Sequence, residues 1–168
     1  MRGPRRCDDK GGFTLVEAVI STIIVAAMLV AALSAVGASR VIQYKVSLHN
    51  RGRLLAGRLL AEVIGQAYED PNVPVVFGPE SGEQTSVRSD FDDVDDYHGW
   101  SESPPTDKDG SAIPQTDGWQ RVVTVEWVDP TDPTVVQGSE TGAKRVTVTA
   151  THGNITHGRI VMIRTGHQ

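Results

Sequence analysis

The feature that most constrains this chain is an apolar segment near its N-terminus. Residues 13–38 read FTLVEAVISTIIVAAMLVAALSAVGA, with one charged side chain, Glu17, and no proline. As an α-helix, these 26 residues would rise about 39 Å, more than the ~30 Å hydrocarbon core of a bilayer. The apolar stretch of a secretory signal is shorter, at ~7–15 residues, and ends at a small-residue cleavage site. The sequence therefore predicts a helix that is retained in a membrane.

Charge is distributed unevenly along the 168 residues, which leave room for about one domain. The first 12 residues carry a net charge of +2 (four bases, two acids), whereas residues 69–117 hold thirteen acids and two bases. The overall net charge of -5 disfavours a general affinity for nucleic acid. These zones predict a basic leader over 1–12, a membrane helix over 13–38, an amphipathic stalk helix over 39–68, an acidic irregular region over 69–119 and a sheet body over 120–168.

Glu17 is the anomaly of the apolar segment. A carboxylate in the middle of a membrane helix costs roughly 2.5–3.5 kcal/mol on insertion scales, and less near the membrane edge. One interpretation is that Glu17 simply reaches the interface. The other interpretation is that Glu17 pairs with a cation at similar depth. A free amino group, created if the chain of a neighbouring copy were cut before Phe13, would supply that cation.

The junction between leader and helix reads GFTLVE over residues 12–17. Behind a short basic leader and ahead of an apolar helix, it resembles the processing motif of type IV prepilins and type II secretion pseudopilins. The resemblance is close over residues 1 to about 40 and only architectural beyond them. It implies that a prepilin peptidase cuts between Gly12 and Phe13 and methylates the Phe13 amine. Glycine suits the extended, unhindered backbone that a protease needs before the cut.

The same resemblance implies the partners and the location. Glu17 would pair with the N-terminal amine of an adjacent subunit, which replaces two unpaired charges in lipid by one ion pair. The partners would be the peptidase, other pilin or pseudopilin subunits, the inner-membrane assembly platform and membrane lipid. The chain would lie in a bacterial inner membrane with its leader in the cytoplasm and its body outside, before it joins a pilus or pseudopilus.

Two departures argue against a major pilin. Cleavage would remove Cys7, the single cysteine, whereas many major pilins carry a C-terminal disulfide loop. The apolar helix also lacks a kinking proline, because the first proline beyond it is Pro71. Pseudopilins and minor pilins remain as the classes of subunit that this sequence could represent.

Beyond residue 38 the pattern becomes amphipathic and predicts one long helix from about Thr14 to Tyr68, with its second half packed on a soluble domain. Apolar residues recur at helical steps and form a stripe, which also contains Gly52. The stripe consists of Val41, Tyr44, Leu48, Leu55, Leu59 and Val63.

The acidic region contains five aspartates that would repel one another unless they are solvated or neutralised: Asp90, Asp92, Asp93, Asp95 and Asp96. Calcium takes 6–8 oxygen ligands from flexible loops and is the one candidate cofactor. The family resemblance adds the analogy of pseudopilins that are stabilised by calcium in a loop near their sheet. The spacing does not fit an EF-hand, however. A solvated loop, a calcium site and a surface for a basic partner all remain open.

The C-terminal residues alternate between apolar and polar side chains over 120–128, 144–152 and 155–164, as half-buried strands do. The first two strands would turn Val123, Val125, Val146, Val148 and Ala150 inward. Gly153 and Asn154 offer a hairpin turn, and residues 134–137 could form a short edge strand. We expect an α+β fold, in which a long N-terminal helix packs on a small antiparallel sheet, as in pilins.

Catalytic motifs are absent from the sequence. It contains no G-x-S-x-G, P-loop or H-E-x-x-H pattern, and no spacing singles out a triad. His152 and His157 could face each other across the hairpin, but two imidazoles without a third ligand are weak evidence for a metal. We therefore expect no enzyme but a structural subunit, a minor pseudopilin or minor pilin. The alternative is a membrane-anchored module whose acidic loop binds calcium or a partner protein.

Overall fold

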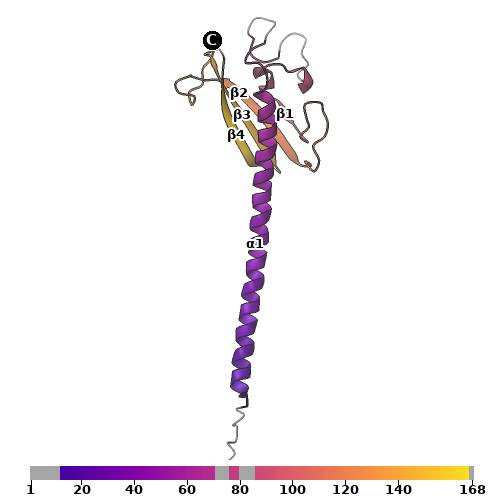
Figure 1. The fold of residues 1–168 in the computed structure, drawn as a ribbon, viewed down its shortest axis with the longest axis vertical. Coiled ribbons are helices and arrows are strands. Elements are labelled where there is room, and N and C mark those ends of the chain that lie inside the picture. The colour runs from indigo at the N-terminus through magenta and orange to yellow at the C-terminus, as the bar shows by residue number, and fades with distance from the viewer. Residues whose placement is uncertain (1–11, 71–75, 80–85, 167–168) are drawn as a thin grey trace, which may run out of the picture. The chain divides into compact units, whose positions relative to one another are not determined.

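The computed structural model describes residues 12–70, 76–79 and 86–166. They fall into two units, which divide after Lys45. The helix α1, Leu15–Val63, contributes its first two thirds to the N-terminal unit and its remaining turns to the C-terminal unit. The fold expected from the sequence is confirmed, since the C-terminal unit combines the end of α1 with an antiparallel sheet (Figure 1).

The helix α1 is continuous because its sequence contains no proline and is rich in alanine and leucine, which are strong helix formers. It ends at Val63, before the predicted Tyr68. There the amide groups of Gly65 and Gln66 turn back to bond the carbonyl groups of Glu62 and Val63. The chain then leaves the helical path, because Ala67 forms a β-bridge with Asp93.

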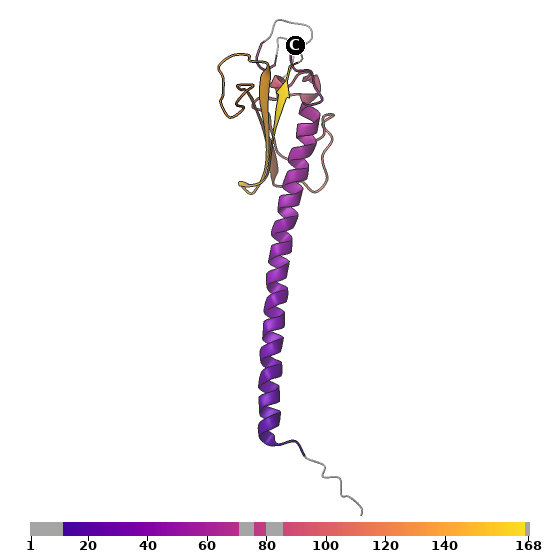
Figure 2. The ribbon, with the colours of Figure 1, turned by 60° about the vertical axis from the view of Figure 1, so that its left-hand side comes forward.

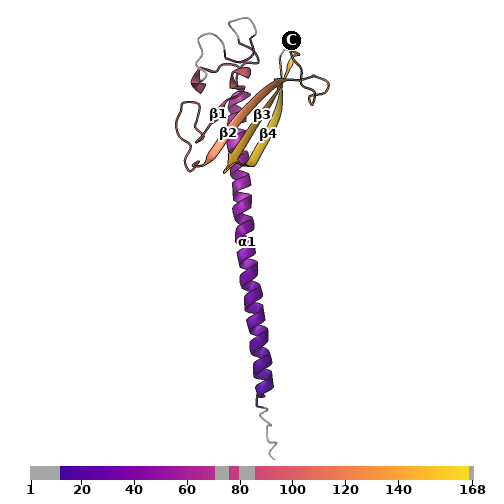
Figure 3. The same cartoon turned by 180° about the vertical axis from the view of Figure 1, so that it is seen from behind.

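The sheet of the C-terminal unit has four antiparallel strands in the order β1-β2-β3-β4 (Figure 3). The strands are β1 (Ser101–Glu102), β2 (Trp119–Trp127), β3 (Ala143–His152) and β4 (Ile155–Thr165). Two short 3-10 helices, η1 (Arg88–Asp90) and η2 (Asp95–Tyr97), precede β1.

The predicted strands are found with slightly different ends. Gly153 and Asn154 both have positive φ, at 56° and 63°, which fits the tight hairpin turn between β3 and β4. The segment predicted as a short edge strand makes only a single bridge, between Val136 and Val128.

The core lies between the last turns of α1 and one face of the sheet, as Figure 2 shows in a side view of the sheet. Helix residues Leu55, Leu59 and Val63 of the predicted stripe are buried, whereas Val41 and Tyr44 are exposed. The sheet contributes the inward residues expected from the alternation, together with Trp119. In this set Val123, Val125, Val146, Val148 and Ala150 are fully buried.

The helix α1 and strand β4 approach each other closely at two glycines. A Cβ atom placed on Gly158 of β4 would lie 2.3 Å from the carbonyl carbon and oxygen of Gly52. A Cβ atom on Gly52 would lie 2.6 Å from the backbone carbon of His157. Helix and strand therefore touch backbone to backbone, and only glycine fits on either side.

Buried ionic groups connect the irregular segment to this frame. The Arg88 guanidinium of η1 is 2.8 Å from Glu62 of α1 and 2.9 Å from Glu102 of β1. Arg121 of β2 pairs with the same Glu102 and donates to the carbonyl oxygen of Leu55, 3.2 Å away. Both arginines are buried, so each needs these acceptors to offset its lost hydration.

The glycine contact can be tested by adding one methyl group. We expect Gly158→Ala to lower the free energy of unfolding by about 1–3 kcal/mol, because its Cβ atom would meet helix backbone rather than a flexible side chain. Denaturant unfolding of the full chain in detergent, followed by tryptophan fluorescence, measures the change.

The matched control is Gly57→Ala, whose Cβ atom would meet only Ile160 Cδ1 at 3.5 Å. That control should be neutral or stabilising by up to ~1 kcal/mol. Equal effects of the two substitutions would contradict the backbone contact.

Candidate functional site

The residues of the processing motif lie at the start of α1. Gly12, Phe13 and Thr14 precede the helix, and the Phe13 side chain is 79% exposed. Thr14 caps the helix, because its Oγ1 accepts a hydrogen bond from the Glu17 amide at 3.3 Å and its carbonyl oxygen accepts one from the Ala18 amide at 3.1 Å. The leader residues before Gly12 lie outside the described part of the chain.

Glu17 occupies the first turn of α1. A threonine followed three residues later by a glutamate is the capping-box pattern, and a carboxylate in the first turn also interacts favourably with the helix dipole. The side chain of Glu17 is exposed. The structure therefore places the carboxylate about one turn from Phe13, at the N-terminal end of α1.

The apolar side chains on the N-terminal part of α1 are not covered by any other described part of the chain. Its most apolar 18-residue window has a mean hydropathy of 2.6, and none of that window is buried. The hydroxyl groups of Thr22 and Ser34 donate to carbonyl oxygens of their own helix, those of Val19 at 2.8 Å and Val30 at 2.9 Å. By length and composition, this helix is able to cross a membrane, and these two hydroxyl groups are satisfied without water.

The five aspartates of the acidic segment are not alike. Asp90 and Asp92 are exposed, whereas Asp93, Asp95 and Asp96 are buried. A solvated loop was one of the predictions for all five aspartates, but only Asp90 and Asp92 are exposed to solvent. The buried three lie in and beside η2, which the β-bridge of Ala67 to Asp93 holds against the end of α1.

Two of the buried carboxylates bond backbone amides of their own segment. Asp93 Oδ1 accepts from the amides of Asp95 at 2.8 Å and Asp96 at 3.2 Å. Asp96 Oδ2 accepts from the amides of Asp92 and Asp93, both at 3.0 Å. Burial, together with the nearby charges of Asp95 and Asp96, raises the pKa of Asp93 to about 8, although the amide of Asp96 and the charge of Lys144 act in the opposite direction.

The third buried carboxylate, Asp95, has a cationic partner. Lys144 of β3 forms an ion pair with Asp95 Oδ1 and also donates to the carbonyl oxygen of Tyr68. The amide of Gly78 donates to Asp95 Oδ2 at 3.2 Å. Lysine and backbone amides thus take up acceptor atoms that a calcium ion would use. Over the described ranges, the structure contains no group of three or more histidine, cysteine or acidic residues arranged to hold a metal. Calcium at Asp90, Asp92, Asp93, Asp95 and Asp96 stays a prediction.

The sequence analysis missed Lys144 and Arg121 as buried residues. The signal was present in the strand alternation. Lys144 has the same parity as Val146 and Val148, and Arg121 has the same parity as Val123 and Val125, so each points to the helix-facing side of the sheet. A charged residue at an inward position of a strand predicts a buried partner, but the sequence alone does not identify it.

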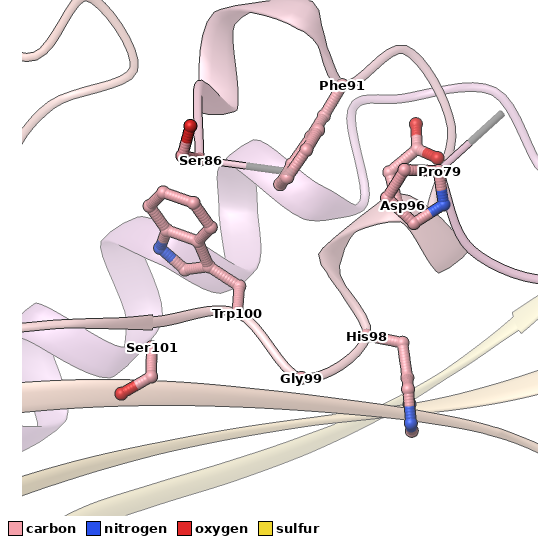
Figure 4. A pocket seen from close by; sticks show the side chains of 8 residues that line it. All are labelled: Pro79, Ser86, Phe91, Asp96, His98, Gly99, Trp100 and Ser101. Atoms are coloured by element: carbon pink, nitrogen blue, oxygen red, sulfur yellow. The ribbon is translucent and has the colours of Figure 1, made fainter. Parts of the chain in front are cut away.

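A cavity of about 440 Å³ opens beside η2 (Figure 4). Asp96 Oδ1 and Trp100 Nε1 are buried without a hydrogen-bond partner in the described structure. Figure 4 shows the two side chains on separate sides of the cavity, and both residues are among its lining. The full lining is Pro79, Ser86, Phe91, Asp96, His98, Gly99, Trp100 and Ser101.

Three histidines gather where α1 meets the β3–β4 hairpin. The rings of His49 and His157 are 5.2 Å apart, and those of His152 and His157 are 6.3 Å apart. His49 Nδ1 lies 3.2 Å from the carbonyl oxygen of His157, and the Trp119 ring contacts both hairpin histidines. His152 and His157 therefore do approach each other as predicted, although not as part of a metal-binding group in the described residues.

No protein-family model, curated protein or solved structure matches this chain.

The histidine group predicts a loss of stability on acidification. Burial, and then the neighbouring His49 and His152, lower the pKa of His157 below its ordinary value near 6.5. The unfolded chain then binds the proton more readily, so stability that is present above pH ~6.5 is lost as the pH falls through and below that value. The raised pKa of Asp93 acts in the opposite direction, so the His157 contribution is measured as the difference between the wild type and His157→Phe, which keeps a ring beside Trp119. We expect the unfolding midpoint of His157→Phe to rise relative to that of the wild type as the pH is lowered from 7.5 to 5. Parallel pH profiles for the two proteins would contradict this assignment.

Proposed function

We propose that this chain is a structural subunit, a minor pseudopilin or minor pilin, that assembles through its N-terminal helix into a type II secretion pseudopilus or a type IV pilus. The observation that carries the proposal is the GFTLVE sequence over residues 12–17, which lies directly at the start of an uncovered apolar helix. The α+β arrangement of the C-terminal unit is also what the family resemblance implies for the fold.

The proposal gives each motif residue a role. A prepilin peptidase would cut between Gly12 and Phe13 and methylate the new amine. Phe13 and Thr14 precede the helix, so the scissile bond lies in non-helical backbone that a protease can bind in an extended form. The methylated amine and the Glu17 carboxylate would then lie at one helix end, one positive and one negative, at a similar depth in the membrane.

Assembly follows from the cost of these charges in lipid. A lone carboxylate or ammonium group in hydrocarbon is unfavourable, and a pair is much less so. Because the amine and the carboxylate are one helical turn apart in each copy, a second helix shifted along its axis brings the amine of one copy to the carboxylate of the other. The apolar side chains of the two helices would then contact each other. Partners would include the membrane platform of the assembly machine, and the resting location would be the bacterial inner membrane.

A membrane-anchored binding module is the alternative, and the cavity beside η2 favours it. Asp96 and Trp100 offer an acceptor and a donor to a small polar group there. This function would not require processing, and Glu17 would be dispensable for it.

Substitution of Glu17 separates the two functions. We expect Glu17→Ala to stay in the membrane but to reduce incorporation into sheared filaments at least about 10-fold, because loss of a buried ion pair costs more than the 1.4 kcal/mol that a factor of ten represents. Immunoblots of the filament and membrane fractions of the native host measure the ratio. Ser34→Ala on the same helix removes only the hydrogen bond to Val30 and should assemble normally. Normal incorporation of the Glu17 variant would contradict the subunit proposal and favour the binding module.

A further inference from the structure

The side chain of Lys144 places an amino group inside the C-terminal unit. It lies on the helix-facing side of β3 and is 0% exposed. Arg88 and Arg121 are also buried, but a guanidinium group remains protonated and is a poor nucleophile. A lysine amine changes its protonation state more readily when it is removed from water, and neutral amines attack carbonyl groups.

The carboxyl group of Asp95 is placed as the electrophile for this amine. Asp95 is 1% exposed, and its Oδ1 is in direct contact with Lys144 Nζ. The other oxygen, Oδ2, accepts a hydrogen bond from the Gly78 amide at 3.2 Å. A donor on that oxygen withdraws electrons from Cγ and would stabilise negative charge that develops on Oδ2 during attack.

The surroundings orient the amine and exclude water. The carbonyl oxygen of Tyr68 accepts a hydrogen bond from Nζ, and the Tyr68 ring centroid is 4.4 Å from Nζ. Val94 and Tyr97, which flank Asp95 and Asp96 in sequence, are both fully buried. Asp93 lies against the same turn, with its Oδ1 on the amide of Asp95 and its carboxyl group 1% exposed.

We propose that Lys144 and Asp95 condense to an isopeptide bond that links β3 covalently to η2. The Nζ–Cγ bond forms, and the bond between Cγ and Oδ1 breaks. The ammonium group begins with three protons: two leave with Oδ1 as water, and the third stays on the amide nitrogen. A lysine ammonium and an aspartate carboxylate thus give an amide and one water molecule, with no oxidant, reductant or other reactant.

Neighbouring groups have a part in each stage. Attack on Cγ requires the unprotonated amine, so a proton must move from Nζ to a carboxyl oxygen before the Nζ–Cγ bond forms. The Gly78 amide faces the oxygen that becomes negative on attack. Asp93 holds the turn that carries the electrophile, because its Oδ1 accepts a hydrogen bond from the Asp95 amide at 2.8 Å. In the product, the remaining N–H continues to donate to the carbonyl oxygen of Tyr68.

The bond would supply a cross-link that this chain cannot make with cysteine. The sequence has one cysteine, Cys7, which precludes an internal disulfide. Lys144 and Asp95 are 49 residues apart, and a cross-link that closes a long loop restricts the unfolded chain strongly. It would hold the acidic segment on the sheet.

The test is the mass of the purified full chain under denaturing conditions, combined with a tryptic map. The expected mass is one water molecule below that calculated for the chain from its observed N-terminus, with any N-methyl group included. The map should contain a branched peptide that joins the segment around Asp95 to the segment around Lys144, because trypsin does not cut after an acylated lysine. This result does not depend on processing at Gly12, which changes only the N-terminal peptide.

Substitutions show which two residues lose the water molecule. Lys144→Met and Asp95→Ala should each keep the water, whether or not they fold. Glu126→Ala removes the partner of Arg145 on the same sheet and should still lose the water. The proposal is overturned if the wild-type chain has its full mass, or if the missing water maps elsewhere, such as to a succinimide at Asp109–Gly110.

Discussion

The C-terminal unit depends on the packing of the last turns of α1 against one face of the sheet. The contact begins where Gly52 meets Gly158 and continues through Leu55, Leu59 and Val63. The glycine pair sets the separation between helix and strand, because no other residue allows the two backbones so close. Once this distance is set, the valines of β2 and β3 reach the helix side chains and fill the layer between them. Everything beyond the helix end, including the acidic segment, is attached to this layer.

Charged residues inside the unit attach the irregular segment to the layer. Glu62 and Glu102 bind Arg88 of η1, and Lys144 binds Asp95 of η2. Buried pairs of this kind contribute little net stability compared with apolar residues, but separating one partner from the other is costly. They therefore specify one position for a segment that has little regular structure. The ion pair with Lys144 also keeps Asp95 of this acidic segment away from solvent.

The fold was largely predictable from the sequence, and the site was predictable only in part. Periodicity identified the helix and three strands, because the spacing of apolar residues reflects which side of each element is buried. The end of the helix was predicted too late, since the bridge between Ala67 and Asp93 is a contact between distant residues. The burial of Asp93, Asp95 and Asp96 could not be predicted either. It depends on Lys144, which is distant in sequence, and on backbone amides whose directions only the folded chain defines.

The proposed function puts the events at the N-terminal end of the chain in one order. Processing at Gly12 would create the amine that Glu17 needs, and the apolar helix would then exchange lipid for neighbouring helices. The most direct measurement is the N-terminal residue and mass of the protein purified from the membranes of its own host. If the proposed function is right, the chain begins at methylated Phe13. A chain that begins at Met1 or Arg2 would contradict it and would leave the anchored binding module as the better description.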